Sequence, residues 1–284
     1  MGRDINKWPV FIKTAAITKK IMNTNFLKTF GLYEKDVWVV GGAGYLGQAT
    51  VELLHSAGAK VLCIDIEDRS RNFIESLSDN SNLSAATLNT RDIERSKHFV
   101  LEQLSNRGVP DGLIDLSYAS TAKGFDELSA AEFDEVNHGG ITASFILSRE
   151  VGNAMKTKKL GSIVLFSSMY GSVSPDPKVY EAPMNVNPIE YGVNKAAIIQ
   201  MTRYLAVHYG KDNVRCNCIS PGPFPSPSVQ QLYPEFVGRL VSKVPMGRIG
   251  EPQEVAGAAV FLISDAASFI TGQNLFVDGG WTSW

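Results

Sequence analysis

The sequence has little cysteine, and no His/Cys cluster shows metal-ligand spacing. Its 284 residues include only three cysteines, Cys63, Cys216 and Cys218, which is too few for a disulfide framework. Cys216 and Cys218 stand two apart in a strand-like run, so they share a face and are poorly placed to bond each other. We therefore expect buried, reduced thiols and no metal site.

Long hydrophobic runs and an excess of charge are also missing. The longest apolar run, Val255–Ile263, has nine residues, against the roughly 20 that a transmembrane helix needs. Lysines and polar residues interrupt the apolar positions near the N-terminus, so no signal-peptide core is expected. A net charge of −2 gives no strong attraction to nucleic-acid phosphates. These absences favour a cytoplasmic protein with neither membrane nor nucleic-acid partners.

From Asp36 onward, strand-like and helix-like segments alternate. The first, Val37–Val40, is a continuous apolar run typical of a buried parallel strand. Further strands are predicted at 60–65, 83–88, 112–117, 161–167, 213–219 and 273–277. Helices are predicted at 46–56, 70–77, 92–106, 129–157, 191–210 and 252–263. The alternation predicts right-handed βαβ units and one α/β domain, doubly wound and of the Rossmann type, with a parallel seven-stranded sheet and helices on both faces.

Three segments stand outside this alternation. Residues 1–35 form an N-terminal extension, whose ragged apolar stripe between Trp8 and Ile21 suits either a docked arm or a disordered segment. The domain proper is 36–284. Within it, 169–190 and 220–248 contain prolines at a density that prevents continuous helix or central strand. Both should emerge at the carboxyl ends of strands, where such folds bind ligands. We interpret 169–190 as an active-site insertion and 223–248 as a substrate loop.

A glycine-rich turn, Gly-Gly-Ala-Gly-Tyr-Leu-Gly at 41–47, joins the first strand to the first helix. Glycines allow the backbone to turn tightly and to approach a pyrophosphate at the helix N-terminus. Asp65 follows Gly47 by 18 residues and ends the second strand, where it can accept hydrogen bonds from ribose hydroxyls. Its charge would repel a 2′-phosphate, so NAD is favoured over NADP. Arg69 and Arg71 keep NADP open.

Tyr191 and Lys195 are four residues apart in a helical stretch and therefore share one face. A nearby ammonium stabilises a phenolate, which should lower the pKa of Tyr191 and make the phenol a usable acid or base near neutrality. A tyrosine and a lysine at this spacing occur often by chance, so the pair gains weight only from its context.

Taken together, these motifs resemble the short-chain dehydrogenase/reductase family over about 36–284. The matching elements are the glycine loop 41–47, Asp92-Ile93, Asn137 in Val-Asn-His-Gly-Gly-Ile, Ser167-Ser168, Tyr191-x-x-x-Lys195, Pro221-Gly222, Arg248-Ile-Gly-Glu-Pro252 and Val277-Asp-Gly-Gly280. The resemblance implies a homodimer or homotetramer, packed through the helices near 129–157 and 191–210 and the last strand.

The resemblance also implies roles for individual residues. Tyr191 exchanges the substrate proton, Lys195 lowers the Tyr pKa and binds the nicotinamide ribose, and Asn137 holds a relaying water. Ser168 stabilises the oxyanion and is preferred over Ser167 as the second serine of the pair. The cofactor-binding set comprises Gly41, Gly44, Tyr45, Leu46, Gly47, Asp65, Asp92, Ile93, Tyr191, Lys195, Pro221 and Gly222.

Three departures from the family pattern narrow the expectation. Tyr45 gives the glycine loop a spacing closer to the family's extended branch, which often acts on nucleotide sugars. The Asn-Asn-Ala-Gly motif is absent after the fourth strand, where Asp115-Leu-Ser-Tyr118 stands instead. Tyr191 follows Ser168 by 23 residues, a longer gap than the single-domain branch usually has. The combination looks like oxidoreductases of bacterial flagellin modification and nonulosonic (sialic-acid-like) sugar synthesis.

We therefore expect an NAD(P)-dependent oxidoreductase that transfers a hydride to or from a secondary alcohol or ketone, in a sugar-derived substrate of bacterial surface-glycan synthesis. Two alternatives remain: a sugar epimerase or dehydratase that holds NAD tightly, and a non-catalytic NAD-binding scaffold. Within the insertion, Glu181 and Glu190 fit either contacts to an amino sugar or solvated loop charges. Its aromatic residues, Tyr170 and Tyr180, fit either sugar stacking or core packing.

Overall fold

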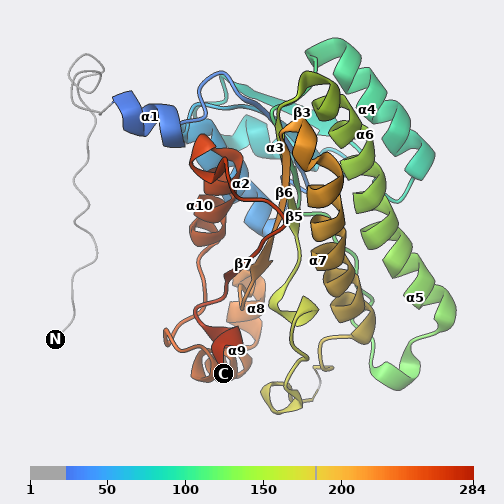
Figure 1. Cartoon of the computed structure of the whole chain (residues 1–284). Coiled ribbons are helices and arrows are strands. Elements are labelled where there is room, and N and C mark those ends of the chain that lie inside the picture. The colour runs from blue at the N-terminus through green and yellow to red at the C-terminus, as the bar shows by residue number, and fades with distance from the viewer. Residues whose placement is uncertain (1–23, 183) are drawn as a thin grey trace.

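A parallel sheet covered on both faces forms the body of the protein in the computed structural model, which describes residues 24–182 and 184–284 (Figure 1). The seven strands stand in the order β3-β2-β1-β4-β5-β6-β7, with every neighbouring pair parallel. They are β1 Asp36–Val40, β2 Lys60–Asp65, β3 Leu83–Thr87, β4 Gly112–Asp115, β5 Gly161–Phe166, β6 Val214–Pro221 and β7 Asn274–Val277. The predicted fold class is confirmed, with strand ends shifted by one or two residues.

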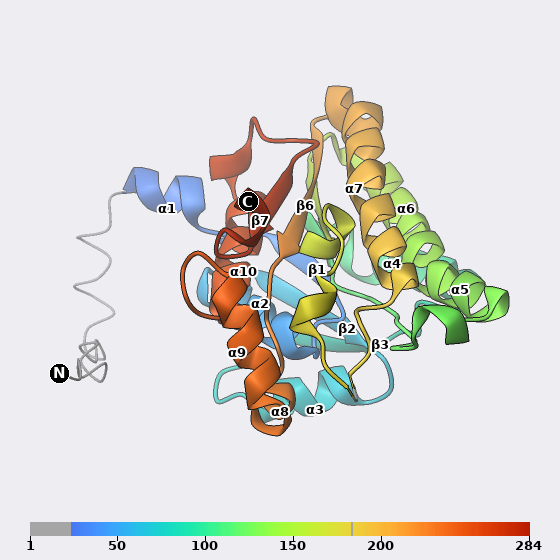
Figure 2. The same cartoon turned by 90° about the horizontal axis from the view of Figure 1, so that it is seen from below.

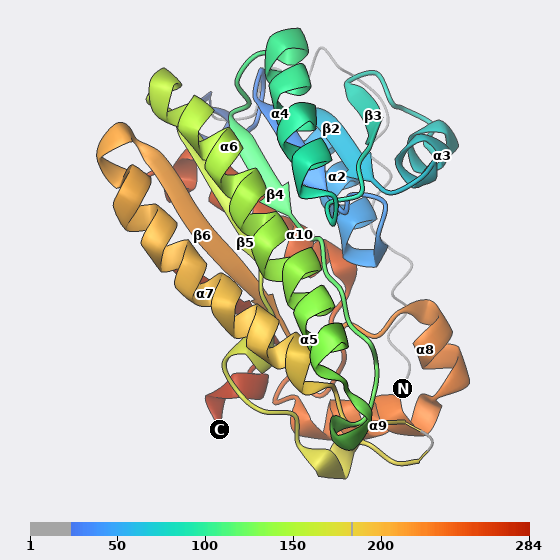
Figure 3. The same ribbon diagram turned by 90° about the vertical axis from the view of Figure 1, so that its right-hand side faces the viewer.

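Two groups of helices cover the sheet. The helices are α1 Thr24–Phe30, α2 Tyr45–Ser56, α3 Arg69–Ser76, α4 Ile93–Arg107, α5 Ala130–Asn137, α6 Ala143–Lys158, α7 Ile189–Tyr209, α8 Pro227–Leu232, α9 Pro234–Lys243 and α10 Pro252–Ile263. Helices α4, α6 and α7 cover one face (Figure 3), while α2 and α10 pack together on the other. Strand order reverses between β1 and β4, so their carboxyl ends open a crevice of the kind that binds ligands in such sheets.

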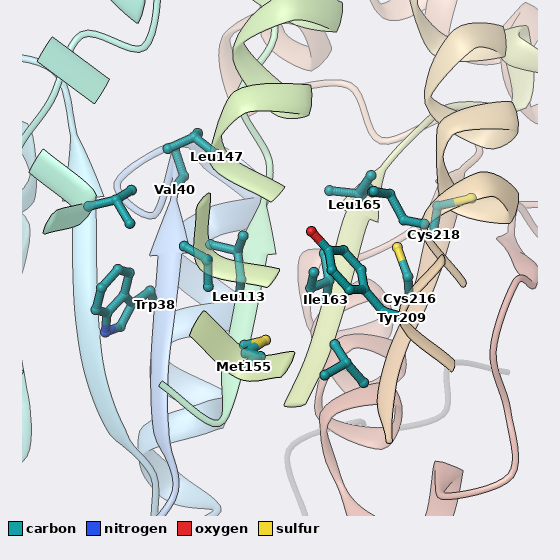
Figure 4. Close-up of a cluster of buried hydrophobic side chains, with 14 of the residues drawn as sticks. Trp38, Val40, Leu113, Leu147, Met155, Ile163, Leu165, Tyr209, Cys216 and Cys218 are labelled. Carbon is teal, nitrogen blue, oxygen red and sulfur yellow. The ribbon is translucent and has the colours of Figure 1, made fainter. Parts of the chain in front are cut away.

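A separate apolar core lies on each face. The core under α4, α6 and α7 includes Trp38, Leu113, Met155, Ile163 and Tyr209, all at most 1% exposed (Figure 4). Cys216 and Cys218 lie in the same cluster, and all three thiols are free and buried, as the sequence predicts. The continuous apolar strand runs reflect this burial on both sides.

The prediction of one continuous helix over 129–157 is wrong. A π turn, His138–Thr142, separates α5 from α6. Two buried glycines, Gly139 and Gly140, lie inside the turn. The apolar periodicity spans the whole segment, so it gives no sign of the added residue that a π turn inserts.

The prediction that prolines keep 220–248 irregular is also wrong. This segment forms α8 and α9, which begin at Pro227 and Pro234. Proline at the first position of a helix loses no hydrogen bond, since that amide has no partner within the helix. Ser226 caps α8 by accepting a hydrogen bond from the amide of Val229. The prolines therefore start helices here instead of preventing them.

The N-terminal extension is tied to the body by its last residues. The stripe between Trp8 and Ile21 lies outside the described residues, and helix α1 was not predicted. Leu32 is fully buried in the core beneath α2 and α10, and its amide donates to the carbonyl of Ala57 at 2.9 Å. Lys35 pairs with Asp265 at 2.7 Å. The core thus includes residues that precede β1.

We predict that Leu32→Ala lowers the free energy of unfolding by about 2–5 kcal/mol, because it removes a buried side chain and leaves a cavity. Urea titration followed by circular dichroism measures the change. Phe26→Ala is the matched control, since Phe26 is 55% exposed on α1. Equal effects of the two substitutions would contradict the docking of Leu32.

Candidate active site

The glycine turn at 41–47 has a geometry that only glycine allows. Gly41 adopts φ +75°, and a Cβ at Gly47 would lie 2.2 Å from the carbonyl oxygen of Gly41. A Cβ at Gly42 would lie 2.7 Å from the Sγ of Cys63, whose pKa is raised to about 12 by burial and by the charge of Asp65. No side chain caps the N-terminus of α2. Its positive end is therefore available to an anion, as a pyrophosphate requires.

Asp65 supports this turn from the end of β2. One carboxylate oxygen accepts a hydrogen bond from the amide of Ala43 at 2.9 Å, and the other accepts from Ile66. The guanidinium of Arg69 lies 3.5 Å from the same carboxylate and is about half exposed. Asp65 is 7% exposed, so it shapes the turn and also presents its charge at the edge of the crevice.

Two other predicted cofactor residues, Asp92 and Ile93, begin α4. Asp92 accepts a hydrogen bond from the amide of Arg95 at 2.9 Å and so caps the helix. At the far side of the crevice, Pro221 ends β6 and the amide of Gly222 donates to the carbonyl of Val277. A Cβ at Gly222 would lie 2.5 Å from the Cα of Asp278, so this turn also requires glycine.

Ser168, Tyr191 and Lys195 meet at the carboxyl end of β5. Ser168 follows that strand, while Tyr191 and Lys195 lie on the first turns of α7. The ammonium of Lys195 donates to the carbonyl of Phe166 at 2.9 Å and lies 5.7 Å from the centre of the Tyr191 ring. Ser167 donates its hydroxyl to the carbonyl of Lys195 at 2.7 Å, so this serine joins β5 to α7.

The electrostatics of Tyr191 differ from the sequence prediction. Burial raises the pKa of Tyr191, and the hydrogen bond with Ser168 lowers it by less. The ammonium of Lys195 points to the Phe166 carbonyl, and its own pKa is lowered to about 8 by burial, which outweighs the opposing charge of Asp115. The prediction of a lowered phenol pKa is therefore wrong. Spacing in the sequence could not reveal how completely the pair is buried.

Asn137 lies across from α7, at the end of α5. Its side-chain oxygen is buried and has no hydrogen-bond partner among the described residues. Buried polar atoms usually find a donor in protein or ordered water. This acceptor therefore suits a bound water.

The role of Asp115, which stands where the Asn-Asn-Ala-Gly motif is absent, was not predicted from the sequence. Asp115, 2% exposed, ends β4 and accepts from the hydroxyl of Ser144 on α6 at 2.6 Å. Its other oxygen accepts from the amide and hydroxyl of Ser117. The carboxylate thus fixes the end of β4 to a helix and to its own loop. Asp115 was visible in the sequence, but Ser144 lies 29 residues later and carries no local signal.

Glu190 was also misread. It is fully buried, and one oxygen accepts from both the amide and the hydroxyl of Thr121, at 3.0 and 2.8 Å. The interpretation of Glu190 as a solvated charge is therefore wrong. The other glutamate of the insertion, Glu181, forms an ion pair with Arg239 at 2.9 Å. Glu190 holds the loop after β4 against the start of α7, next to Tyr191.

The active-site insertion packs against α9 over the carboxyl ends of the strands (Figure 2). The hydroxyls of Tyr170 and Tyr180 lie 2.8 Å apart, and the Tyr180 ring packs against Phe236. Arg239 of α9 donates to the carbonyl of Val179 at 2.7 Å. The two proline-rich segments therefore form one body beside Tyr191.

In the described part of the chain, no helix combines the length and the apolar character that a bilayer span requires. Nor do three or more His, Cys, Asp or Glu side chains gather there as metal ligands would.

Comparison with known proteins covers nearly the whole chain. The profile of the family described as enoyl-(acyl carrier protein) reductase matches residues 42–282. An NAD-dependent glycerol dehydrogenase of Listeria innocua is 30% identical over 258 residues, covering 90% of this chain and 97% of the relative.

Two solved structures have the same fold. A short chain dehydrogenase from Leptospira borgpetersenii with bound NAD+ matches with a TM-score of 0.81 and 31% identity, covering 92% of this chain and 97% of the other. A Beutenbergia cavernae protein, provisionally described as an NAD(P)-dependent gluconate 5-dehydrogenase, has NADP bound at low occupancy. It matches with a TM-score of 0.80 and 28% identity over 90% of this chain and all of the other.

The buried ammonium makes a pH-dependent prediction. Below pH 8 Lys195 is protonated both folded and unfolded, and the folded state bears the cost of burying the charge. Between the folded pKa of about 8 and the ordinary value of 10.5, the unfolded state binds more protons, so stability rises with pH.

We therefore predict that the free energy of unfolding of the wild type, minus that of Lys195→Met, rises by roughly 3 kcal/mol across this window. Urea denaturation at pH values from 7 to 10.5 measures it. The exposed Lys211→Met is the control for replacing a lysine by methionine. A difference that stays flat or falls would show that the Lys195 charge is not destabilised by burial.

Proposed function

The chain belongs to the short-chain dehydrogenase/reductase family of oxidoreductases, and on that premise we propose that it transfers a hydride between NAD and a secondary alcohol or ketone of a sugar-derived substrate. One observation carries the proposal: Ser168, Tyr191 and Lys195 meet at the carboxyl end of β5, on the same edge of the sheet as the glycine turn. An acid/base group thus lies where the fold binds a dinucleotide.

The crevice fits a dinucleotide. The uncapped N-terminus of α2 and the glycine turn suit a pyrophosphate, which Gly41, Gly44, Tyr45, Leu46 and Gly47 would hold. Asp65 would accept from ribose hydroxyls, Asp92-Ile93 would flank the adenine, and Pro221-Gly222 would lie by the nicotinamide. When bound, the nicotinamide supplies or accepts the hydride.

The side chains of this chain manage the proton. In the reducing direction, the phenol of Tyr191 donates its proton to the substrate oxygen, and in the oxidising direction the phenolate takes the hydroxyl proton. The hydroxyl of Ser168 donates a hydrogen bond to the same oxygen and stabilises its developing charge. A protonated Lys195 favours the phenolate, and a water held by Asn137 returns the proton from solvent.

The substrate class rests on the insertion and on the relatives. The insertion and α9 pack together next to Tyr191 through a cluster that includes Tyr170 and Tyr180, so this proline-rich body is where a sugar-derived substrate would be contacted. The relatives include a glycerol dehydrogenase and a protein described as a gluconate dehydrogenase. An amino sugar of the bacterial surface-glycan pathways is the first candidate, and the proposed setting is the cytoplasm.

A homodimer or homotetramer is part of the proposal. Helix α7 exposes Tyr204 and Val207, at 69% and 85%, and β7 exposes Phe276. Apolar side chains grouped on α7 and on a terminal strand suit burial against a second copy. A mass of two or four chains by light scattering at micromolar concentration would agree with this, and a monomer would not.

The test of the proposed function is NAD(H) binding together with turnover of amino-sugar phosphates, nucleotide sugars and simple polyols. We predict NADH formation or consumption with a sugar-derived substrate. No binding at millimolar NAD(H) would refute the proposal. Co-purified NAD and conversion without net NADH would indicate an epimerase or dehydratase instead.

Tyr191→Phe should lower kcat about 10²–10⁴-fold, because it removes the proton donor, while changing the Kd for NADH by less than about twofold. Stopped assays and fluorescence titration measure the two. Tyr33→Phe is the matched control, since Tyr33 is 63% exposed and precedes β1, at the opposite end of the sheet from Tyr191. Full activity of Tyr191→Phe would remove Tyr191 from the chemistry.

We predict that Asp65→Asn lowers kcat/KM for NAD and raises it for NADP, changing their ratio at least about tenfold, or about 1.4 kcal/mol. The amide oxygen can still accept from Ala43, although the side chain no longer accepts from Ile66. The charge that repels a 2′-phosphate is gone, and Arg69 remains beside the glycine turn. Asp68→Asn, on an exposed carboxylate paired with Arg71, is the control. An unchanged ratio would contradict the role of Asp65.

A further inference from the structure

The π turn after Asn137 determines where that side chain lies. Asn137 is the last residue of α5, and the turn His138–Thr142 begins directly after it. A π turn re-aims the residues on either side of it and is frequent at functional sites. Because the Asn137 side-chain oxygen has no partner of its own, its place is set by the backbone that carries it.

Helix α7 packs a side chain into this turn. Asn194, 2% exposed, follows Tyr191 by three residues and directly precedes Lys195. A Cβ added at Gly140 would lie 2.0 Å from the Asn194 Nδ2 and 2.6 Å from its Cγ. The carboxamide therefore occupies the space that a side chain at 140 would need, and only glycine is compatible with it.

The same carboxamide hydrogen-bonds the backbone beside Asn137. Asn194 Nδ2 donates to the carbonyl of Val136 at 3.4 Å. This bond is long and hence weak, so the close packing on Gly140 is the stronger observation. The Asn194 side chain thus contacts the backbone both before Asn137, at Val136, and after it, at Gly140.

We propose that Asn194 is a positioning residue, which holds the π turn and so sets Asn137 relative to Tyr191 and Lys195. The inference rests on the proposed function for the role of Asn137. One turn of α7 thus carries the acid/base group, the lysine and the side chain that aligns the facing helix. Misplacing a catalytic group by about 1 Å can cost on the order of 100-fold in rate.

The test is a double-mutant cycle between Asn194→Ala and Asn137→Ala. We expect Asn194→Ala to lower kcat about 10- to 100-fold with KM within about twofold. If Asn194 acts through Asn137, kcat of the double variant falls no further than kcat of Asn137→Ala alone. A fold-decrease equal to the product of the two single-variant decreases would overturn the inference. Thr202→Val, which removes a buried hydroxyl elsewhere on α7, is the matched control.

Gly140→Ala provides a second variant that leaves Asn194 unchanged, because its methyl group must displace the carboxamide. We expect it to lower kcat as Asn194→Ala does. Gly257→Ala is its control, since nothing lies within 4 Å of a Cβ on that helical glycine. Unchanged turnover in Gly140→Ala, together with a large loss in Asn137→Ala, would overturn the positioning role of Asn194. It would leave the proposed function standing.

Amide hydrogen exchange tests the same inference without turnover. Asn194→Ala should speed exchange over 138–142 at least about tenfold, and Thr202→Val should leave that segment unchanged. Equal exchange in Asn194→Ala and wild type would overturn the positioning role. Absence of turnover in the wild type would refute the proposed function but would leave this result interpretable.

Discussion

The burial of the Lys195 ammonium is the constraint around which the site is arranged. A buried charge needs close polar partners, and this one has the carbonyl of Phe166 at 2.9 Å and the charge of Asp115 nearby. The end of β5 must therefore lie against the start of α7. Ser167, which donates to the carbonyl of Lys195, fixes the same junction from the other side. Strand β5, helix α7 and the buried lysine are thus one structural unit.

The same junction extends to the loop after β4. Asp115 connects β4 to Ser144 of α6, and Glu190 connects Thr121 to the start of α7. Asp115 stands where the resemblance leads us to expect the Asn-Asn-Ala-Gly motif, and its charge opposes the lowering of the Lys195 pKa by burial. A neutral amide at that position would not provide this charge. The departure from the family pattern is therefore an electrostatic change as well as a structural one.

The sequence predicted the parts of the molecule that depend on local pattern. Continuous apolar runs located the strands, and the glycine turn followed from its place between the first strand and the first helix. The missing parts depend on contacts between distant segments. Asn194 reaches Val136 across 58 residues, and Glu190 reaches Thr121 across 69. Helices α8 and α9 were not predicted for a different reason. Proline was interpreted as a helix breaker, although at the first helical position it removes no hydrogen bond of the helix.

Cys63 gives the nucleotide turn a built-in reporter. Its sulfur lies directly beneath Gly42, fully buried, and its pKa of about 12 keeps it as an unreactive thiol. An alkylating reagent can reach it when the turn, or the helix α2 that follows it, moves away from β2. Since the other two thiols lie in the opposite core, the order in which the three sulfurs react would separate local opening of the nucleotide turn from unfolding of the whole sheet.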